Sequence, residues 1–276
     1  MTTSIPLTLT TLCLTLSGFT SVHADDNLKV DRAALLQQVW SHLENGDSAQ
    51  ATDYVESRGA PLLVAAVYSN LVRDLYGAKH DVPRMIIIGR AGCAFCLAQS
   101  QAAAKSGDEK LALSLKSFAK EIAYNVSANC WPGWEDKGIV ITLTDQRIGL
   151  DLAKLNLRLG RELKRGDDKI SAAHWLVGAH LLGLGQHSAA IEQFEQSAKL
   201  DNSGERRDAE QMALGYIAIA KLASNPENEA AKRQLDEAVT VLKQLGTEDA
   251  KFFASQLVSV NKFFAKLTAA SKESGQ

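Results

Sequence analysis

This chain lacks an excess of positive or of negative residues. Its 30 lysines and arginines nearly balance 32 acidic residues, which leaves a net charge of −2. No basic run with interleaved aromatic residues occurs, so the electrostatic attraction that nucleic-acid binding depends on is absent, and we expect no nucleic-acid partner. After residue 24 we also expect no membrane span, because the most apolar run, Met85–Ile88, is soon interrupted by Arg90.

Charged residues are absent from the first 24 positions. An apolar stretch from Leu7 to Phe19 is followed by the small residue Ala24 and then by the acidic Asp25. This order is typical of a secretory signal peptide, although the usual lysine or arginine near the start is missing. We therefore predict that residues 1–24 are a signal peptide and that the protein is exported, with the periplasm as the favoured location and secretion as the alternative.

Strand-like alternation is also nearly absent, and only the short run 138–143 hints at it. Elsewhere apolar residues recur at helical spacing in segments rich in Ala, Leu, Lys, Glu and Gln, which predicts an all-α fold. About ten or eleven helices are expected. Their predicted ranges are 31–45, 47–58, 61–77, 82–105, 108–128, 144–165, 169–184, 187–200, 206–223, 228–245 and 248–270.

Proline, aspartate and glycine support these boundaries. Pro61 and Pro83 suit the first turn of a helix, where a missing N–H costs nothing. Residues expected to cap helix N-termini are Asp47, Asp81, Asp108, Asp168 and Thr247. Glycines expected where helices stop are Gly46, Gly59, Gly77, Gly107, Gly166, Gly185 and Gly246.

One segment shows the self-similarity of a helical repeat. Residues 174–202 carry small and large residues at a fixed spacing over two helices. Gly178 and Ala190 are small and allow the two helices to approach, while Leu181 and Phe194 fill the space beside them. This spacing resembles a tetratricopeptide repeat (TPR), and residues 206–245 repeat it in part. The resemblance implies a TPR-like α-solenoid of antiparallel helix pairs.

The resemblance also implies a binding surface. TPR proteins hold peptides or extended segments on the inner face formed by the first helix of each pair, so a protein or peptide partner is expected here. The inner-face residues carried over to this chain are Trp175, Ala179, Leu182, Met212, Tyr216 and Ile219. The alternative is that these side chains only complete the core between neighbouring pairs.

The repeat pattern divides the chain into regions. We expect degenerate helical repeats over 25–128, with 82–105 as a first helix and 108–128 as its second, a Trp-rich connecting loop over 129–143, and TPR-like repeats with a C-terminal capping helix over 144–270. Residues 271–276 form a tail. Helix 144–165 fits no pair, yet it carries two apolar stripes, which predicts that it is sandwiched between neighbours.

Three cysteines remain after signal removal: Cys93, Cys96 and Cys130. An odd number leaves at least one thiol free or paired between chains. The Cys-x-x-Cys spacing falls in the middle of a predicted helix without a preceding strand, unlike thioredoxin-like sites. Buried structural thiols are therefore favoured over a disulfide, and both over redox or metal chemistry.

Other catalytic motifs are missing. The histidines are scattered, and Gly183-Leu-Gly185 lacks the final glycine and the preceding strand of a nucleotide fingerprint. No nucleophile motif or paired-acid arrangement stands out. We expect no enzyme activity, no cofactor and no metal site.

The stretch Trp131-Pro132-Gly133-Trp134 lies in the connecting loop. Pro132 and Gly133 predict a type II turn, in which glycine takes the positive φ. The two tryptophans can then pack down and clamp a loop that is otherwise long for a helical domain. Contact with a ligand or partner is the alternative.

These observations favour an exported scaffold that mediates protein–protein interactions, for example in cell-envelope assembly. A thiol-redox or metal-binding periplasmic protein that uses Cys93, Cys96 and Cys130 is the second hypothesis. A structural solenoid that oligomerises through its N-terminal helices is the third, and the oligomeric state is left open by the sequence.

Overall fold

The structure, a computed structural model, describes residues 31–273, so the predicted signal peptide lies outside the described residues. Residues 31–273 form eleven α-helices, one 3₁₀ turn and no strand, which confirms the predicted fold class. The helices of the first half are α1 (Arg32–Glu44), α2 (Ser48–Glu56), α3 (Pro61–Gly77), α4 (Val82–Lys105) and α5 (Glu109–Asn129). The 3₁₀ turn η1 (Pro132–Trp134) precedes α6 (Leu143–Glu162), α7 (Asp167–Gly183), α8 (His187–Ser203), α9 (Arg207–Ser224), α10 (Glu229–Leu245) and α11 (Glu248–Glu273).

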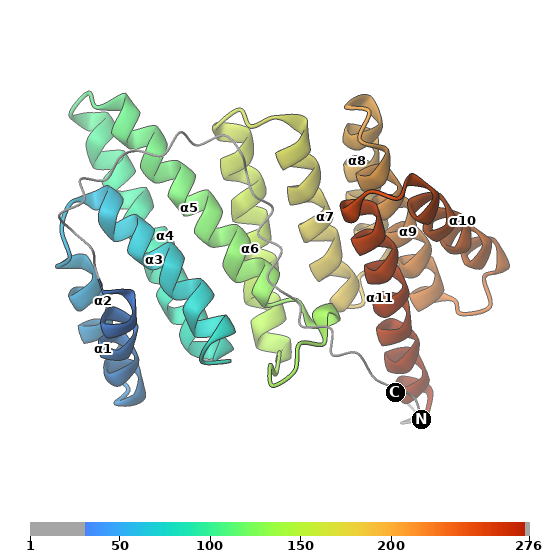
Figure 1. Cartoon of the computed structure of the whole chain (residues 1–276), viewed down its shortest axis with the longest axis horizontal. Helices are drawn as coiled ribbons and strands as arrows, with labels where there is room; N and C mark the ends of the chain where they lie inside the picture. Colours follow the sequence, from blue (N-terminus) through green and yellow to red (C-terminus); the bar gives the residue numbers. More distant parts are fainter. Residues whose placement is uncertain (1–30, 274–276) are drawn as a thin grey trace.

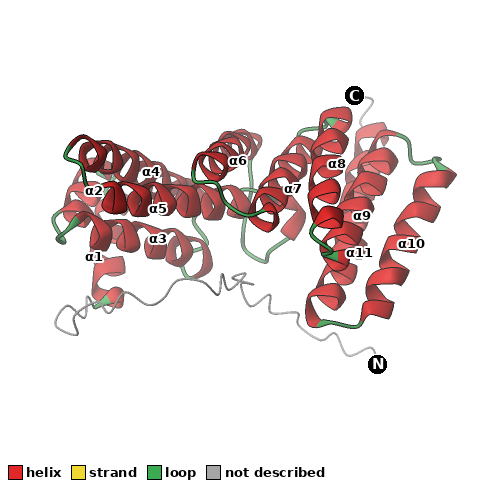
Figure 2. Cartoon of the chain, turned by 90° about the horizontal axis from the view of Figure 1, so that it is seen from above, coloured by secondary structure: helices red, strands yellow, loops and turns green. Residues whose placement is uncertain are grey.

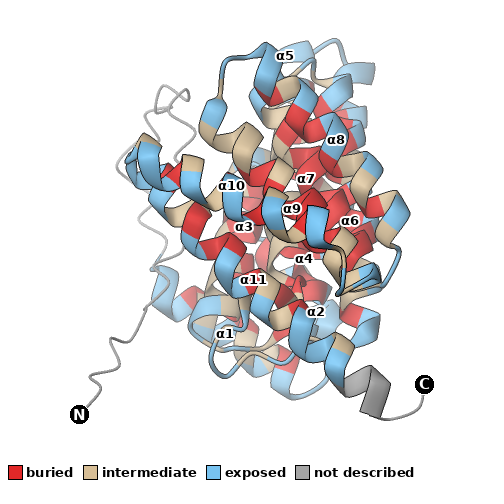
Figure 3. Cartoon of the chain, turned by 90° about the vertical axis from the view of Figure 1, so that its right-hand side faces the viewer, coloured by how far each residue is buried: buried red, intermediate tan, exposed pale blue. Residues whose placement is uncertain are grey.

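The helices follow one another along the long axis of the molecule, from α1 and α2 at one end to α10 and α11 at the other (Figure 1). Each packs against the next, and Figure 2 shows the same succession from above. The buried residues lie between the helices and the exposed residues on the outside (Figure 3). This arrangement is a solenoid of helix pairs.

Contacts between alternate helices show how the pairs are built. α3 packs along α5, and α9 packs along α11, whereas α2 with α4 and α4 with α6 touch only slightly. The first helices of the pairs are therefore the odd-numbered ones. This pairing corrects the expectation that residues 82–105 open a pair, and it makes α6 the second helix of the α5–α6 pair, so it is no longer unpaired.

Helix ends follow the predicted caps with two corrections. The side chains of Asp47, Asp81 and Asp108 each accept a hydrogen bond from a backbone N–H of the first turn, and Thr247 does the same for Ala250. Asp168 is not a cap. It lies within the first turn of α7, and the N-cap position is taken by Gly166.

Gly166 has an extended backbone with φ of −60° and begins α7, so it does not end the preceding helix as predicted. The turn after α6 is instead closed by Lys164, a non-glycine residue with φ of 51°. Glycine is favoured at such a position because it has no Cβ to strain, so the sequence pattern placed the stop two residues too late.

Two hydrophobic cores meet at α6. The N-terminal core contains the buried residues of α1–α5, and the C-terminal core contains those of α7–α11 together with Trp131. Leu152 and Leu159 of α6 belong to the N-terminal core, while Leu150 and Leu157 belong to the C-terminal core. The two predicted stripes of this helix are thus confirmed, and α6 is a wall shared by both cores.

Small residues allow close helix approach in the repeat, as the sequence predicts. A Cβ atom added to Gly178 would lie 2.7 Å from a ring carbon of Phe194, and one added to Gly215 would lie 2.4 Å from Leu257. Real Cβ contacts do not become this short, so glycine at these positions lets α8 and α11 pack directly on their neighbours.

The terminal helix α11 packs on both α9 and α10. An apolar stripe runs along α11 at helical spacing: Leu257, Val260 and Phe264 are buried, but Leu267, further along, is 46% exposed. The stripe therefore covers the end of the C-terminal core only over its first four turns or so, since α9 does not extend further along it.

One described helix, α4, is long and apolar enough by length and composition to cross a membrane. The expectation that no segment after residue 24 meets this test is therefore wrong. In the structure 44% of the apolar window of α4 is buried inside the molecule, where the helix packs between α3 and α5, and core helices of water-soluble folds meet the same test.

Candidate functional site

A cluster of aromatic rings lies where the connecting loop crosses between α7, α9 and α11. Trp131 and Trp134 meet edge to face with ring centroids 4.8 Å apart. Trp175 of α7 lies 6.0 Å from Trp131, and Tyr216 of α9 lies 5.4 Å from Trp175. Close backbone contact between α7 and α9 is slight, so these rings fill the space between the two helices.

Both loop tryptophans also make hydrogen bonds. The indole N–H of Trp131 donates to the carbonyl oxygen of Ala179 at 2.9 Å, and that of Trp134 donates to the carbonyl oxygen of Ala128 at 2.8 Å. Trp131 is almost completely buried, with 1% of its surface exposed. The loop is thus held from α5 across to α7, in the geometry expected of a clamp.

The turn itself differs from the predicted type II turn. Residues Pro132–Trp134 form the 3₁₀ turn η1, and the positive φ falls on Glu135, with φ of 49°, and not on Gly133. Gly133 is needed for space, because a Cβ there would lie 2.4 Å from the Trp131 ring. The sequence correctly indicated that the turn needs Gly133, but the reason is the lack of space for a Cβ and not a positive φ.

The six predicted inner-face residues do not line an open groove. All are buried, with between 0% and 9% of their surface exposed. They are Trp175, Ala179, Leu182, Met212, Tyr216 and Ile219. The expectation of an accessible surface at these positions is therefore corrected: in this conformation they belong to the C-terminal core, and Trp131 covers Trp175, Ala179 and Tyr216.

One buried polar atom among the rings, the indole nitrogen of Trp175, has no hydrogen-bond partner. The hydroxyl of Tyr216 and the side chain of Gln256 on α11 lie beside each other and interact. An unpaired buried polar group costs about 1–3 kcal/mol, so this region is less fully satisfied than an ordinary core.

The three cysteines are free and buried. Burial raises the pKa of the Cys93 and Cys96 thiols to about 12, and it raises the pKa of Cys130 further. Cys93 donates to the carbonyl oxygen of Ala119. The thiols are therefore protonated at neutral pH and poor nucleophiles.

Cys130 is also separated from the other two cysteines. Cys130, at the end of α5, lies by the start of α4, where Asn129 contacts Met85. Cys93 and Cys96 lie two to three turns further along α4, a distance of about 12–17 Å. The predicted thiol site is thus not brought together, and the described residues contain no group of three or more His, Cys, Asp or Glu side chains that could hold a metal ion.

A buried histidine joins the two halves near Cys130. His180 of α7 donates from Nε2 to the carbonyl oxygen of Ser127 at 2.9 Å, and the Ser127 hydroxyl donates to the carbonyl oxygen of Gly149 on α6 at 2.8 Å. The other ring nitrogen of His180 has no partner. Burial lowers the pKa of His180 to about 4, so the ring is neutral at physiological pH.

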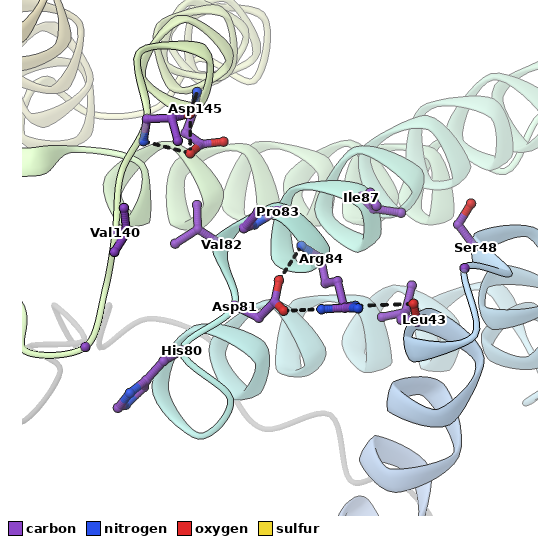
Figure 4. Close-up of a pocket in the computed structure, with 13 residues that line it drawn as sticks. Leu43, Ser48, His80, Asp81, Val82, Pro83, Arg84, Ile87, Val140 and Asp145 are labelled. Atoms are coloured by element: carbon purple, nitrogen blue, oxygen red, sulfur yellow. Dashed lines mark hydrogen bonds and ion pairs between the residues drawn. The ribbon is translucent and has the colours of Figure 1, made fainter.

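An open cleft lies at the start of α4 (Figure 4). Its volume is about 580 Å³, and it lies between the α1–α2 turn, the α3–α4 turn and the segment 138–142. The exposed part is apolar: Ile87 is 42% exposed and Val140 is 76% exposed, and Leu143, just beyond the lining, is 52% exposed.

The charged groups of this cleft, Asp81, Arg84 and Asp145, are already engaged. Asp81 accepts from the backbone N–H of Arg84 at 2.8 Å and pairs with its guanidinium, and Arg84 donates to the carbonyl oxygen of Leu43 (Figure 4). Asp145 accepts from both the backbone N–H and the hydroxyl of Thr142 in the capping box of α6. The cleft therefore offers apolar contact and no free acid–base pair.

Sequence reasoning did not find this cleft. The residues that form it are separated by up to 100 positions, and only the apolar Val140 in a loop gave a signal. A run of β-branched residues after a glycine looks like part of a short strand, which is how the run 138–143 was interpreted.

Comparisons with known proteins give limited information. No protein-family model matches the chain, and no curated protein matches it. Among solved structures, it is similar to a crystal structure from Podosopora anserina that is described as kinesin light chain nearly identical TPR-like repeats. The two share 14% sequence identity with a TM-score of 0.47, over 78% of this chain and 95% of that chain.

Proposed function

We propose that the protein is an exported, periplasmic scaffold that binds a protein partner, with cell-envelope assembly as its setting. The signal-peptide pattern of residues 1–24 supports export. The helix-pair solenoid supports a binding role, because such folds present an extended surface for their size. The observation that carries the proposal is the open cleft at the start of α4.

The cleft suits a partner with an apolar side chain. Ile87 remains 42% exposed and Val140 76% exposed although the chain has a core available to bury apolar residues. Clustered exposed apolar residues mark interaction sites more often than scattered ones do. Because Asp81, Arg84 and Asp145 already have partners within the chain, the cleft can close over an apolar group without leaving a charge unpaired.

The test is crosslinking of the tagged protein in the periplasm of its native host, followed by identification of captured proteins. We expect Ile87→Asp and Val140→Asp to reduce capture of the partner by about tenfold or more, equivalent to about 1.4 kcal/mol. The matched control is Leu113→Asp. Leu113 is 51% exposed and lies at the opposite end of the α4–α5 pair, near Ser100.

Equal capture by all three variants would refute the cleft as the binding site. Cell fractionation tests the location separately: the full chain should reach the periplasm with Asp25 at its N-terminus, whereas a chain lacking residues 1–24 should stay in the cytoplasm. No observation among the described residues favours the thiol-redox or metal-binding alternative.

A further inference from the structure

Lys120 of α5 is a partly buried amine without an ion-pair partner. Its side chain lies against the end of α6, where its Cε is 3.5 Å from the position that a Cβ would take at Gly160. The centroid of the Tyr124 ring is 6.0 Å from Nζ, at the outer limit of a cation–π interaction. Within residues 31–273, Nζ makes no hydrogen bond and no ion pair. The three N–H donors of this ammonium are therefore unused by the described chain.

Two cations from neighbouring elements face this amine. Arg165 lies in the turn after α6, and Lys169 lies in the first turns of α7. Glu121 and Asp168 also act on the ammonium, but neither forms an ion pair with it. Glu121 accepts from the Ser69 hydroxyl at 3.1 Å, and Asp168 pairs with Lys169 at 2.8 Å. The end of the Lys120 side chain is therefore a place where a negative group is favoured.

The protonation of Lys120 reflects these surroundings. Burial, and to a smaller extent Arg165 and Lys169, lower the pKa of Lys120 to about 8. An ordinary lysine has a pKa of about 10.4. At pH 7.4 about one fifth of the Lys120 amines are therefore neutral, against about one in a thousand for an ordinary lysine. A neutral amine is a nucleophile, whereas an ammonium is not.

We propose that Lys120 binds carbon dioxide as a carbamate, whose carboxylate pairs with Arg165 and Lys169 and so links α5 to the α6–α7 turn. The lone pair of Nζ forms a bond to the carbon atom, one C=O electron pair moves onto an oxygen, and one N–H proton passes to water. The neutral amine and carbon dioxide thus give a carbamate of charge −1 and one proton, with no oxidant or reductant. The inference goes beyond the proposed function, because this site is not part of the cleft at α4.

The surroundings suit the carbamate better than the ammonium. The reaction replaces a positive charge by a negative one, so Arg165 and Lys169 change from repelling neighbours to attracting ones. The guanidinium of Arg165 has five N–H donors and gives one of them to the Ser117 hydroxyl, which leaves donors for a carboxylate. The absence of a side chain at Gly160 leaves space beside the Lys120 stem.

The test uses the unaltered protein, equilibrated at pH 7.4 with carbon dioxide and bicarbonate labelled with carbon-13. We expect a carbamate signal in the carbon NMR spectrum. Trapping with triethyloxonium, followed by peptide mass spectrometry, should place the ethylated carbamate on Lys120. Lys116, one turn earlier on α5, is the internal control, because its ammonium already pairs with Glu162 at 3.1 Å. Occupancy at Lys120 should exceed that at Lys116 by about tenfold or more.

Variants separate the carbamate from its partners. Lys120→Arg keeps a positive charge but cannot form a carbamate, so the trapped group at position 120 should disappear. The melting temperature of the unaltered protein should rise with carbon dioxide at constant pH and ionic strength, and that of Lys120→Arg should not. Arg165→Gln and Lys169→Gln should each lower occupancy at Lys120 by about threefold or more. Arg158→Gln is the matched control, because Arg158 pairs with Glu162 and is 65% exposed.

The inference is overturned if Lys120 and Lys116 are labelled equally, or if Lys120 stays unlabelled at pH 8, where more of its amine is neutral. It is also overturned if Arg165→Gln and Lys169→Gln both leave occupancy unchanged, because the carboxylate then does not pair with these residues. The labelling measurement needs no variant, so it does not depend on whether a substituted chain folds. None of these outcomes affects the crosslinking experiment at the α4 cleft, which tests the proposed function separately.

Discussion

The two cores of this solenoid are filled in different ways. In the N-terminal core, α3 and α5 pack directly on each other, and Tyr68 is the only aromatic residue among its buried members in the described part of the chain. In the C-terminal core, α7 and α9 stay apart and the rings of Trp131, Trp175 and Tyr216 lie between them. In one half of the solenoid, neighbouring first helices therefore pack directly on each other. In the other half, aromatic side chains, one of them from a loop, fill the space between them.

The two cores also differ in how many of their buried polar atoms lack a hydrogen-bond partner. Among the described residues, the buried side-chain atoms without a partner all belong to α6 and the C-terminal half. The N-terminal core buries mainly aliphatic side chains, which need no partners. Direct packing leaves few polar atoms to satisfy, whereas a ring-filled gap buries N–H and O–H groups that must find acceptors.

The largest expected effect separates the two cores energetically. Trp131→Ala removes the central ring of the C-terminal core and should cost about 3–5 kcal/mol of unfolding free energy, while Leu71→Ala in the N-terminal core should cost about 2–5 kcal/mol. Hydrogen exchange should speed up in α7, α9 and α11 for the first variant and in α1–α4 for the second. Uniform acceleration across the whole chain in both variants would show that the cores unfold as one unit.

The next effect concerns the junction at His180. Its pKa is lowered to about 4 in the folded protein and is about 6.5 in an unfolded chain. The unfolded state therefore binds more protons below pH 6.5, and stability falls as the pH drops from about 6.5 to about 4, by about 3 kcal/mol in total.

Urea denaturation at several pH values measures this dependence. The comparison is with His180→Gln, because other groups titrate in the same range and contribute equally to both proteins. The variant should lose the part of the pH dependence between 6.5 and 4 that His180 contributes, so its slope should be smaller than that of the unaltered protein. An unchanged slope would place the ring in a solvated environment and weaken the view of the junction as a sealed boundary.

A smaller effect tests the packing at the same junction. A Cβ added to Gly149 would lie 2.3 Å from a ring carbon of His180, whereas one added to Gly77, at the end of α3, meets nothing within 4 Å. Gly149→Ala should therefore lose about 1–3 kcal/mol, and Gly77→Ala should gain up to about 1 kcal/mol. Thermal denaturation of both variants, each compared with the unaltered protein, gives the sign; equal shifts would contradict the close approach at Gly149.

The smallest effect concerns the exposed ion pair between the connecting loop and α11. Lys266 is 72% exposed and its partner Glu135 is 45% exposed, and such pairs contribute about 0–1 kcal/mol. Lys266→Ala should change the midpoint of denaturation only slightly. A loss comparable to that of Trp131→Ala would mean that the connecting loop is held by this ion pair and not by its two indoles.

The helices themselves were predictable from the sequence. Periodic apolar residues, prolines at first turns and aspartate caps placed each α-helix within a few residues of its observed bounds, because these signals act locally. The two stripes of α6 were predictable for the same reason: a residue at helical spacing must share a face with its neighbours.

The candidate sites were less predictable. Trp175 and Tyr216 were correctly assigned to one side of the solenoid, but nothing local to either residue shows that a loop 40 or more positions away covers them. The pairing register was missed in the N-terminal half because α4 and α5 pack together whichever of them is counted first. The cleft depends on three separate turns, and its apolar lining has no periodicity to detect.

The shared wall formed by α6 makes the molecule sensitive to rotational phase. Each residue of an α-helix turns the chain by about 100°, so one residue inserted after Leu152 would carry Leu157 and Leu159 away from their respective cores together. Seven inserted residues would bring them back to nearly the same orientation, about 20° short of two full turns. The effect of a length change within α6 therefore depends on how far it departs from a whole number of turns, and not on how many residues are added.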